Sequence, residues 1–275
     1  MVAVDRVDVI TKILDYESKG LFNNDVEDDV ETIPLTVDKV DYLYEKPFAK
    51  LSNKIANVCA TAYFENKIRK GQLVIKEIKG IENYLKVKDE GVFITCNHFH
   101  PYDNYALYRV IRPYLNKKCL NKVIKEGNYT SFKGIYGYFF RHCNTLPLSS
   151  NIHVMQKFMK AVKTLLDRKE KILIYPEQSM WWNYKKPRPM QNGAFKLAVK
   201  NNAPILPFFI TMENTHKFDE SGYPVQSYTI NILPAIYKDD KLKDSENVEM
   251  MKNKNYKAWK EVYEDFYKVE LTYGE

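Results

Sequence analysis

The spacing of apolar residues changes near Gly71 and divides the chain into two patterns. Before Gly71, apolar side chains in residues 47–70 recur at three- and four-residue steps, which predicts an amphipathic helix that Gly71 ends. After it, short apolar runs predict strands at residues 72–78, 92–96, 122–124, 172–175, 205–210 and 228–233. Helical patterns lie between and after these runs, at residues 104–112, 132–141, 154–168, 193–200 and 248–269.

This alternation predicts an α/β fold: a mixed, largely parallel sheet flanked by helices on both faces, with an N-terminal amphipathic helical segment. The expected organisation is an acidic extension at residues 1–45, the helical segment at 46–71, a core at 72–235, and a C-terminal helical segment packed on the core at 236–275. In such folds, functional side chains gather where strands end and helices begin.

Composition narrows the class of protein. With 275 residues, 45% of them hydrophobic and 14% aromatic, the chain has enough apolar surface for one large domain and is not expected to be disordered. A membrane span needs about 18 apolar residues in a row, and the runs here are far shorter. Charges near the N-terminus stand where a signal peptide would have its apolar region, so we expect the protein in the cytoplasm.

The cysteines Cys59, Cys96, Cys119 and Cys143 form no CxxC pair. Their spacing argues against a zinc ribbon, and a cytoplasmic location argues against disulfides. We interpret them as packing residues.

The amphipathic segment at residues 47–70 has two interpretations. Its apolar stripe is typical of a helix that packs on a core. Its lysines also suit a helix that lies on an anionic bilayer. The pattern alone does not separate the two.

The formal net charge of +7 hides a division within the chain. Residues 1–45 hold twelve acidic and four basic residues, a net charge of −8, and residues 46–275 carry +15. Basic stretches at residues 109–141 and 181–200 suit phosphates, anionic lipid headgroups or acidic protein partners, although a plain lysine-rich surface has the same composition. Nucleic acid is disfavoured as a partner, because no zinc-finger spacing, RNP-like aromatic motif or GXXG loop accompanies the charge.

The first strand-to-helix junction with candidate chemistry is at residues 94–104. A buried-looking strand ends at Asn97, and His98 stands five residues before Asp103. A carboxylate at the start of the next helix can turn back and hold the imidazole in one tautomer, so that the other nitrogen can accept a proton from an alcohol. Asp103 could instead be a helix cap beside a turn histidine. His98 and His100 could also bind a metal, but no second ligand motif follows them.

The second junction is at residues 172–182. An apolar strand leads into Pro176 and Glu177, and two tryptophans and a basic run follow. An acid directly after a buried strand needs a partner or a solvated position. Glu177 could be an ordinary surface acid, and the tryptophans favour a loop that lines a pocket or an interface.

Together these junctions resemble the glycerolipid acyltransferase family, typified by 1-acylglycerol-3-phosphate O-acyltransferases. Four blocks appear in the family's order, at residues 97–103, 134–150, 175–179 and 193–207. The first has the family's His-x4-Asp spacing, and the third, Tyr-Pro-Glu-Gln-Ser, matches the family's Phe-Pro-Glu-Gly-Thr-Arg in part. The resemblance covers roughly residues 72–235.

The resemblance implies acyl transfer from a thioester to an alcohol, in phospholipid or glycerolipid synthesis. His98 would be the general base and Asp103 would orient its imidazole. The acyl donor would be acyl-CoA or acyl carrier protein, the acceptor a lysophosphatidic acid-like or other lysolipid, and no metal or redox cofactor would be needed. The substrate-binding residues that it implies are Glu177, Gln178, Ser179, Arg141, Lys185 and Arg188.

The chain departs from the family at two positions associated with the acceptor's phosphate. Ser150 and Met180 stand where the family has arginines, so other bases take that role or the acceptor has no phosphate. These departures also fit a lipid-binding relative that has lost the chemistry. The amphipathic segment in place of an apolar anchor suggests peripheral attachment to the inner face of the cell membrane, on an anionic surface.

Overall fold

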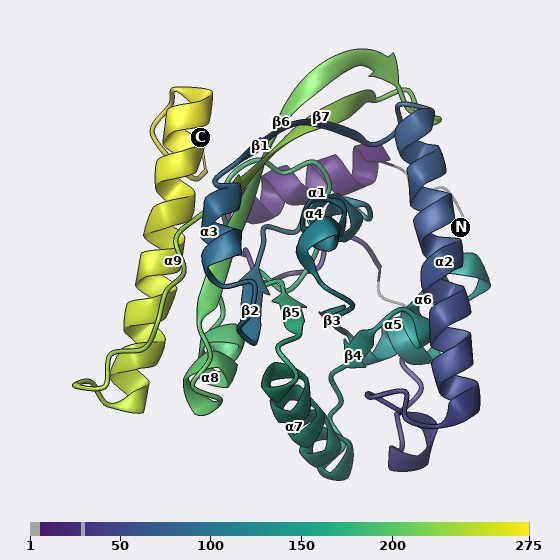
Figure 1. Cartoon of the computed structure of the whole chain (residues 1–275). Coiled ribbons are helices and arrows are strands. Elements are labelled where there is room, and N and C mark those ends of the chain that lie inside the picture. Colours follow the sequence, from purple (N-terminus) through teal and green to yellow (C-terminus); the bar gives the residue numbers. More distant parts are fainter. Residues whose placement is uncertain (1–5, 29–30, 275) are drawn as a thin grey trace.

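The computed structural model describes residues 6–28 and 31–274 and contains a seven-stranded sheet of order β1-β7-β6-β2-β5-β3-β4 (Figure 1). The strands are β1 (Val74–Lys79), β2 (Val92–Thr95), β3 (Leu120–Ile124), β4 (Thr145–Pro147), β5 (Lys171–Ile174), β6 (Ile205–Phe218) and β7 (Pro224–Ile232). Neighbouring strands pair in parallel except β6 and β7, which are antiparallel. The predicted mixed, largely parallel sheet is confirmed.

Helices cover both faces of this sheet, as predicted. The helices of the described residues are α1 (Arg6–Ser18), α2 (Pro47–Arg69), α3 (Ile81–Lys86), α4 (Asp103–Ile111), α5 (Glu126–Thr130), α6 (Gly134–His142), α7 (Ile152–Asp167), α8 (Gly193–Lys200) and α9 (Asp244–Tyr267). Short 3-10 helices lie at Val37–Lys39 and Arg112–Tyr114. In Figure 1 the long helices α9 and α2 stand at opposite flanks of the molecule.

The alternation of strand side chains creates two apolar cores. In β2, Phe93 packs in the core that α7, α8 and α9 share with one face of the sheet. Its neighbours Val92 and Ile94 pack in the other core, with α2, α3, α4 and α6. A strand buried on both faces reads as a continuous apolar run, which is why the sequence pattern located β2 and β5 closely.

The sequence did not predict α1, α3, α5 or β4. Helices α3 and α5 and the edge strand β4 are too short to show a period. In α1, only Val9, Ile13 and Glu17 are buried, so its apolar pattern is sparse. Strand β6 extends beyond its predicted end to Phe218, because its exposed second half pairs with β7 in a hairpin that runs past the core.

The predicted amphipathic helix is present as α2, but most of the apolar stripe in its first half does not pack. Ala56 and Phe64 are its buried residues. Phe48, Leu51 and Val58 have exposed fractions of 82%, 56% and 63%. Within the described residues, no helix is both long enough and apolar enough to cross a membrane.

A close approach between β2 and α7 generates a stability prediction. A Cβ at Gly91 would lie 2.2 Å from the carbonyl oxygen of Leu166. We expect Gly91→Ala to lower the free energy of unfolding by about 1–3 kcal/mol, measured by urea denaturation, because backbone would have to move. Gly193→Ala is the control, since no heavy atom lies within 4 Å of its Cβ position. Equal stability of the two variants would contradict this account.

Candidate active site

The backbone after β2 is fixed by the side chain of Asn97. This residue is 2% exposed, donates from Nδ2 to the carbonyl of Ile210 (3.0 Å), and accepts from the Ile210 amide at Oδ1 (2.8 Å). The amide therefore replaces a pair of backbone hydrogen bonds between the end of β2 and β6. This bridge sets the direction in which the chain enters the turn of His98.

Asp103, the first residue of α4, closes that turn. Its side chain is fully buried, and Oδ2 accepts from His98 Nδ1 at 2.7 Å and from the amides of Phe99 (3.1 Å) and His100 (3.3 Å). A carboxylate at a helix N-terminus is favourable for the helix dipole. Because Oδ2 accepts from Nδ1, the hydrogen of neutral His98 is on Nδ1 and Nε2 carries the lone pair. The His98 side chain is 21% exposed, so the structure joins a partly exposed imidazole to a fully buried carboxylate.

Glu177 holds the same turn from the other side. It is 3% exposed, and its Oε2 accepts from the His98 amide at 3.1 Å. Its Oε1 accepts from the Arg188 amide at 2.8 Å, and the Arg188 guanidinium lies 3.4 Å from Oε2. A buried acid at the end of a strand needs a partner, and for Glu177 this partner is Arg188, eleven residues later in the chain. The structure brings Glu177 to His98 through the backbone.

Arg188 has a set of protein partners of its own. Its side chain is 1% exposed, and Nη1 donates to the carbonyl of Phe22 (3.1 Å) and to Ser179 Oγ (3.3 Å). The guanidinium lies over the Trp181 ring, 4.7 Å from its centroid. The other predicted substrate-binding residue of this loop, Ser179, also has a partner in the N-terminal segment, since its Oγ donates to the carbonyl of Asn24 at 3.3 Å.

The other predicted substrate-binding residues lie on the surface or in other contacts. Gln178 is exposed and has a positive φ of 66°, at the position where the resembling family has glycine. Arg141 donates to the carbonyl of Phe132 at 3.1 Å. Lys185 is exposed and lies 5.6 Å from the Tyr267 ring centroid. Gln178 directly follows Glu177, whose side chain reaches the His98 amide, whereas Arg141 and Lys185 contact other parts of the protein.

The N-terminal segment covers the loop after β5, which the sequence did not predict. Trp181 is fully buried and donates from Nε1 to the carbonyl of Asn24 at 3.0 Å. Trp181 and Trp182 pack with Val9 and Ile13 of α1. The two indoles in a polar loop were the signal for this interface, which lies within the chain.

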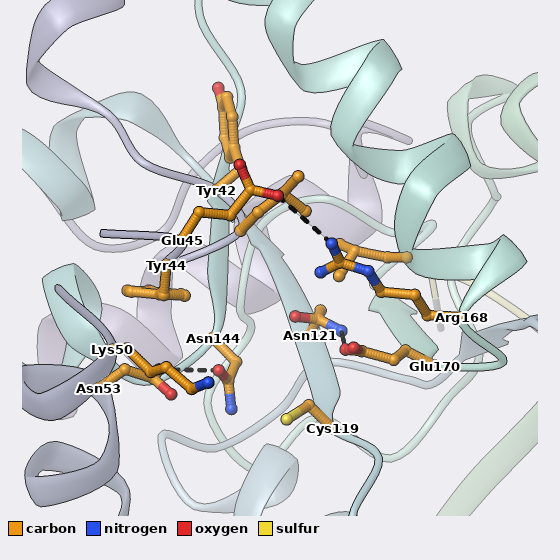
Figure 2. A pocket seen from close by; sticks show the side chains of 12 residues that line it. Tyr42, Tyr44, Glu45, Lys50, Asn53, Cys119, Asn121, Asn144, Arg168 and Glu170 are labelled. Carbon is orange, nitrogen blue, oxygen red and sulfur yellow. Dashed lines mark hydrogen bonds and ion pairs between the residues drawn. The ribbon is translucent and has the colours of Figure 1, made fainter. Parts of the chain in front are cut away.

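A cavity of about 450 Å³ lies away from this turn (Figure 2). Its walls include Cys119 and Glu170, which precede β3 and β5, whereas His98 follows the carboxyl end of β2. Ligands of parallel α/β sheets bind at the carboxyl ends of strands. Many of its polar groups pair with each other, as in the dashed contacts of Figure 2: Glu45 with Arg168 (3.3 Å), Asn121 with Glu170 (2.8 Å) and Asn53 with Asn144 (2.8 Å).

The residues considered as metal ligands have other surroundings. His100 Nδ1 accepts from the Tyr102 amide at 3.2 Å. In the part of the chain that the structure describes, no three His, Cys, Asp or Glu side chains are grouped to hold a metal ion. The four cysteines are free thiols; Cys96 and Cys143 are buried, as expected of packing residues, but Cys59 is exposed on α2.

Comparisons with known proteins give a family match and a structural likeness. Residues 76–211 match the sequence model of the family described as Acyltransferase. A search of the curated proteins finds no match. Among solved structures, the chain is similar to PlsC, the 1-acyl-sn-glycerophosphate (LPA) acyltransferase from Thermotoga maritima, with 16% identity and a TM-score of 0.45 over 76% of this chain and 79% of that chain.

His100 generates a prediction for the pH dependence of stability. Burial lowers the pKa of His100 from 6.5 to about 4. Between these two pH values, the unfolded chain binds a proton at His100 that the folded chain does not. The free energy of unfolding therefore decreases as the pH falls from 6.5 towards 4, and this loss is absent above pH 6.5. We expect His100→Gln to remove up to about 3 kcal/mol of this acid-side loss, measured by urea denaturation between pH 4 and 8. His153→Gln, at an exposed site on α7, is the control. Parallel stability curves for wild type and His100→Gln would contradict the prediction.

Proposed function

The chain belongs to the acyltransferase family, and from this premise we propose that it moves a fatty acyl group from a thioester to the hydroxyl of a lysolipid. The observation that carries the proposal is the 2.7 Å contact between His98 Nδ1 and the buried carboxylate of Asp103. This contact leaves Nε2 to accept a proton, and it stabilises the imidazolium that then forms.

In the proposed reaction, His98 Nε2 takes the proton of the acceptor hydroxyl while the oxygen attacks the thioester carbonyl carbon. The new C–O bond forms, the C–S bond breaks, and the leaving thiolate receives the proton from the imidazolium. The acyl group passes directly to the acceptor, so the enzyme needs no nucleophile of its own. The acyl donor is a cosubstrate, and none of these steps calls for a metal or redox cofactor.

We propose acyl-CoA or acyl carrier protein as the donor and a lysophosphatidic acid-like or other lysolipid as the acceptor. The basic stretch at residues 181–200 supports a donor with phosphates or an acidic surface. For the acceptor, the surroundings of Arg188 are informative. Its guanidinium is buried among protein groups, so it does not take the place of the family's arginine at the position of Met180. This observation favours an acceptor without a phosphate as the second candidate.

Transfer of labelled acyl groups to a panel of lysolipids tests the activity. We expect His98→Ala to lower kcat by about 10²–10⁴-fold, because the general base is lost, while circular dichroism shows a retained fold. The panel pairs phosphate-bearing and neutral acceptors, and each is tried with acyl-CoA and acyl carrier protein. His153→Ala is the control at a surface histidine. Undiminished transfer by folded His98→Ala would overturn the mechanism.

We further propose that the protein acts from the cytoplasm, attached peripherally to the inner face of the cell membrane through α2. The apolar side chains Phe48, Leu51, Ile55 and Val58 are exposed on this helix, with fractions of 82%, 56%, 48% and 63%. Exposed Lys50 and Lys54 lie among them. An apolar stripe with lysines on an exposed helix is typical of attachment to an anionic bilayer.

Sedimentation with anionic vesicles tests this attachment. We expect Lys50→Glu with Lys54→Glu to weaken vesicle binding at least about tenfold, because each lysine near an anionic surface contributes about 1 kcal/mol. Lys254→Glu with Lys257→Glu makes the same charge change at exposed positions of α9 and is the control. Equal binding of both double variants would assign α2 to packing alone. This test is independent of catalysis.

A further inference from the structure

Tyr175 lies beside the turn of His98 because of the register between β2 and β5. Thr95, the last residue of β2, pairs in parallel with Ile174, the last residue of β5. The residue after β5 therefore leaves the sheet next to the residues after β2. The Tyr175 ring lies against the His98 imidazole, with 3.8 Å between ring centroids and an interplanar angle of 16°.

The phenol of Tyr175 contacts the second oxygen of the same carboxylate that orients His98. Its hydroxyl donates to Asp103 Oδ1 at 2.6 Å. The other oxygen, Oδ2, accepts from His98 Nδ1 and from the amides of Phe99 and His100. Asp103 is fully buried, so a donor lost at Oδ1 is not simply replaced by bulk water. Tyr175 thus touches both members of the dyad.

The phenol remains a neutral donor over the range in which an enzyme works. Burial, followed by the charge of Asp103, raises the pKa of the Tyr175 hydroxyl well above its ordinary value of 10.0. A hydrogen bond from a neutral donor to a carboxylate is charge-assisted and short, which agrees with the observed distance. The direction of the bond is therefore settled: the oxygen of Tyr175 donates and Asp103 accepts.

We propose that Tyr175 is a positioning residue of the acyl-transfer site, which acts through Asp103 and through the ring of His98; the inference rests on the function proposed above. The stacked ring limits rotation of the imidazole, so Nε2 keeps one direction. The phenol limits rotation of the carboxylate, so Oδ2 stays on Nδ1. When the imidazole takes the acceptor's proton, the aromatic face also stabilises the positive charge.

The variant Tyr175→Phe removes one oxygen and keeps the stacked ring. We expect kcat to fall about tenfold with KM within twofold of wild type, because the substrate is bound elsewhere and a charge-assisted hydrogen bond is lost. The acid-side half-maximum of kcat/KM should move up by about half a pH unit, because a carboxylate with one donor fewer favours a protonated imidazole more strongly.

Tyr105→Phe is the matched control. The Tyr105 hydroxyl is also a phenol that donates to a carboxylate, Glu65, at 3.0 Å, outside the dyad. Removal of the Tyr105 hydroxyl shows how loss of a phenol–carboxylate hydrogen bond outside the dyad affects activity. We expect kcat and the pH profile of Tyr105→Phe to stay as in wild type. Tyr175→Leu, which loses the ring as well, should lower kcat further than Tyr175→Phe.

A spectroscopic measurement separates this inference from the proposed function. The Nδ1 proton of His98, held by Asp103, should give a downfield proton NMR signal that moves in Tyr175→Phe and not in Tyr105→Phe. An unmoved signal, or an active Tyr175→Phe with the wild-type kcat and pH profile, would overturn the role of Tyr175. Absence of acyl transfer by the wild type with every donor and acceptor would count against the proposed function instead, and the signal would still test the contact.

Discussion

Two buried carboxylates hold the turn that carries His98, and the rest of the site depends on them. Burying a charged carboxylate costs free energy unless hydrogen bonds compensate, and each of these two accepts several hydrogen bonds. Asp103 gathers the imidazole, two amides and a phenol. Glu177 gathers the His98 amide together with the amide and guanidinium of Arg188. Since both contact His98, one through its ring and one through its backbone, the imidazole has little freedom left.

This requirement extends the scaffold well beyond the segment that matches the family. Arg188 needs acceptors of its own, and the carbonyl of Phe22 in the N-terminal segment is one of them. Ion pairs add to the same interface, with Lys186 and Glu17 at 2.6 Å and Lys125 and Asp25 at 2.6 Å. The acidic N-terminus and the basic core thus partly neutralise each other. In the sequence, the division of charge suggested an external partner. In the fold, part of the basic charge has its partner in the acidic N-terminal segment of the same chain.

The sequence predicted what local pattern controls and missed what long-range contacts control. Strand β2 is a continuous apolar run and helix α8 has apolar residues at helical spacing, so both are visible in the sequence. The spacing of His98 and Asp103 predicted their contact, because both residues belong to one turn. Glu177 is different. Its partner Arg188 lies across a loop, and one acceptor of that arginine, the carbonyl of Phe22, is 166 residues away in the chain. A short polar motif could not show that this acid faces the protein interior and pairs with Arg188.

Aromatic packing connects the proposed membrane helix to the proposed catalytic turn. Phe64 of α2 contacts Tyr102, with ring centroids 5.8 Å apart, and Tyr102 contacts His100 at 4.6 Å. His100 in turn gives its amide to Asp103. Closely packed side chains are only slightly compressible, so a displacement of one ring moves the next. An α2 seated on a bilayer would therefore fix the height of His98 above the lipid surface, where a lysolipid hydroxyl is presented, whereas a flexible tether would fix only the average distance.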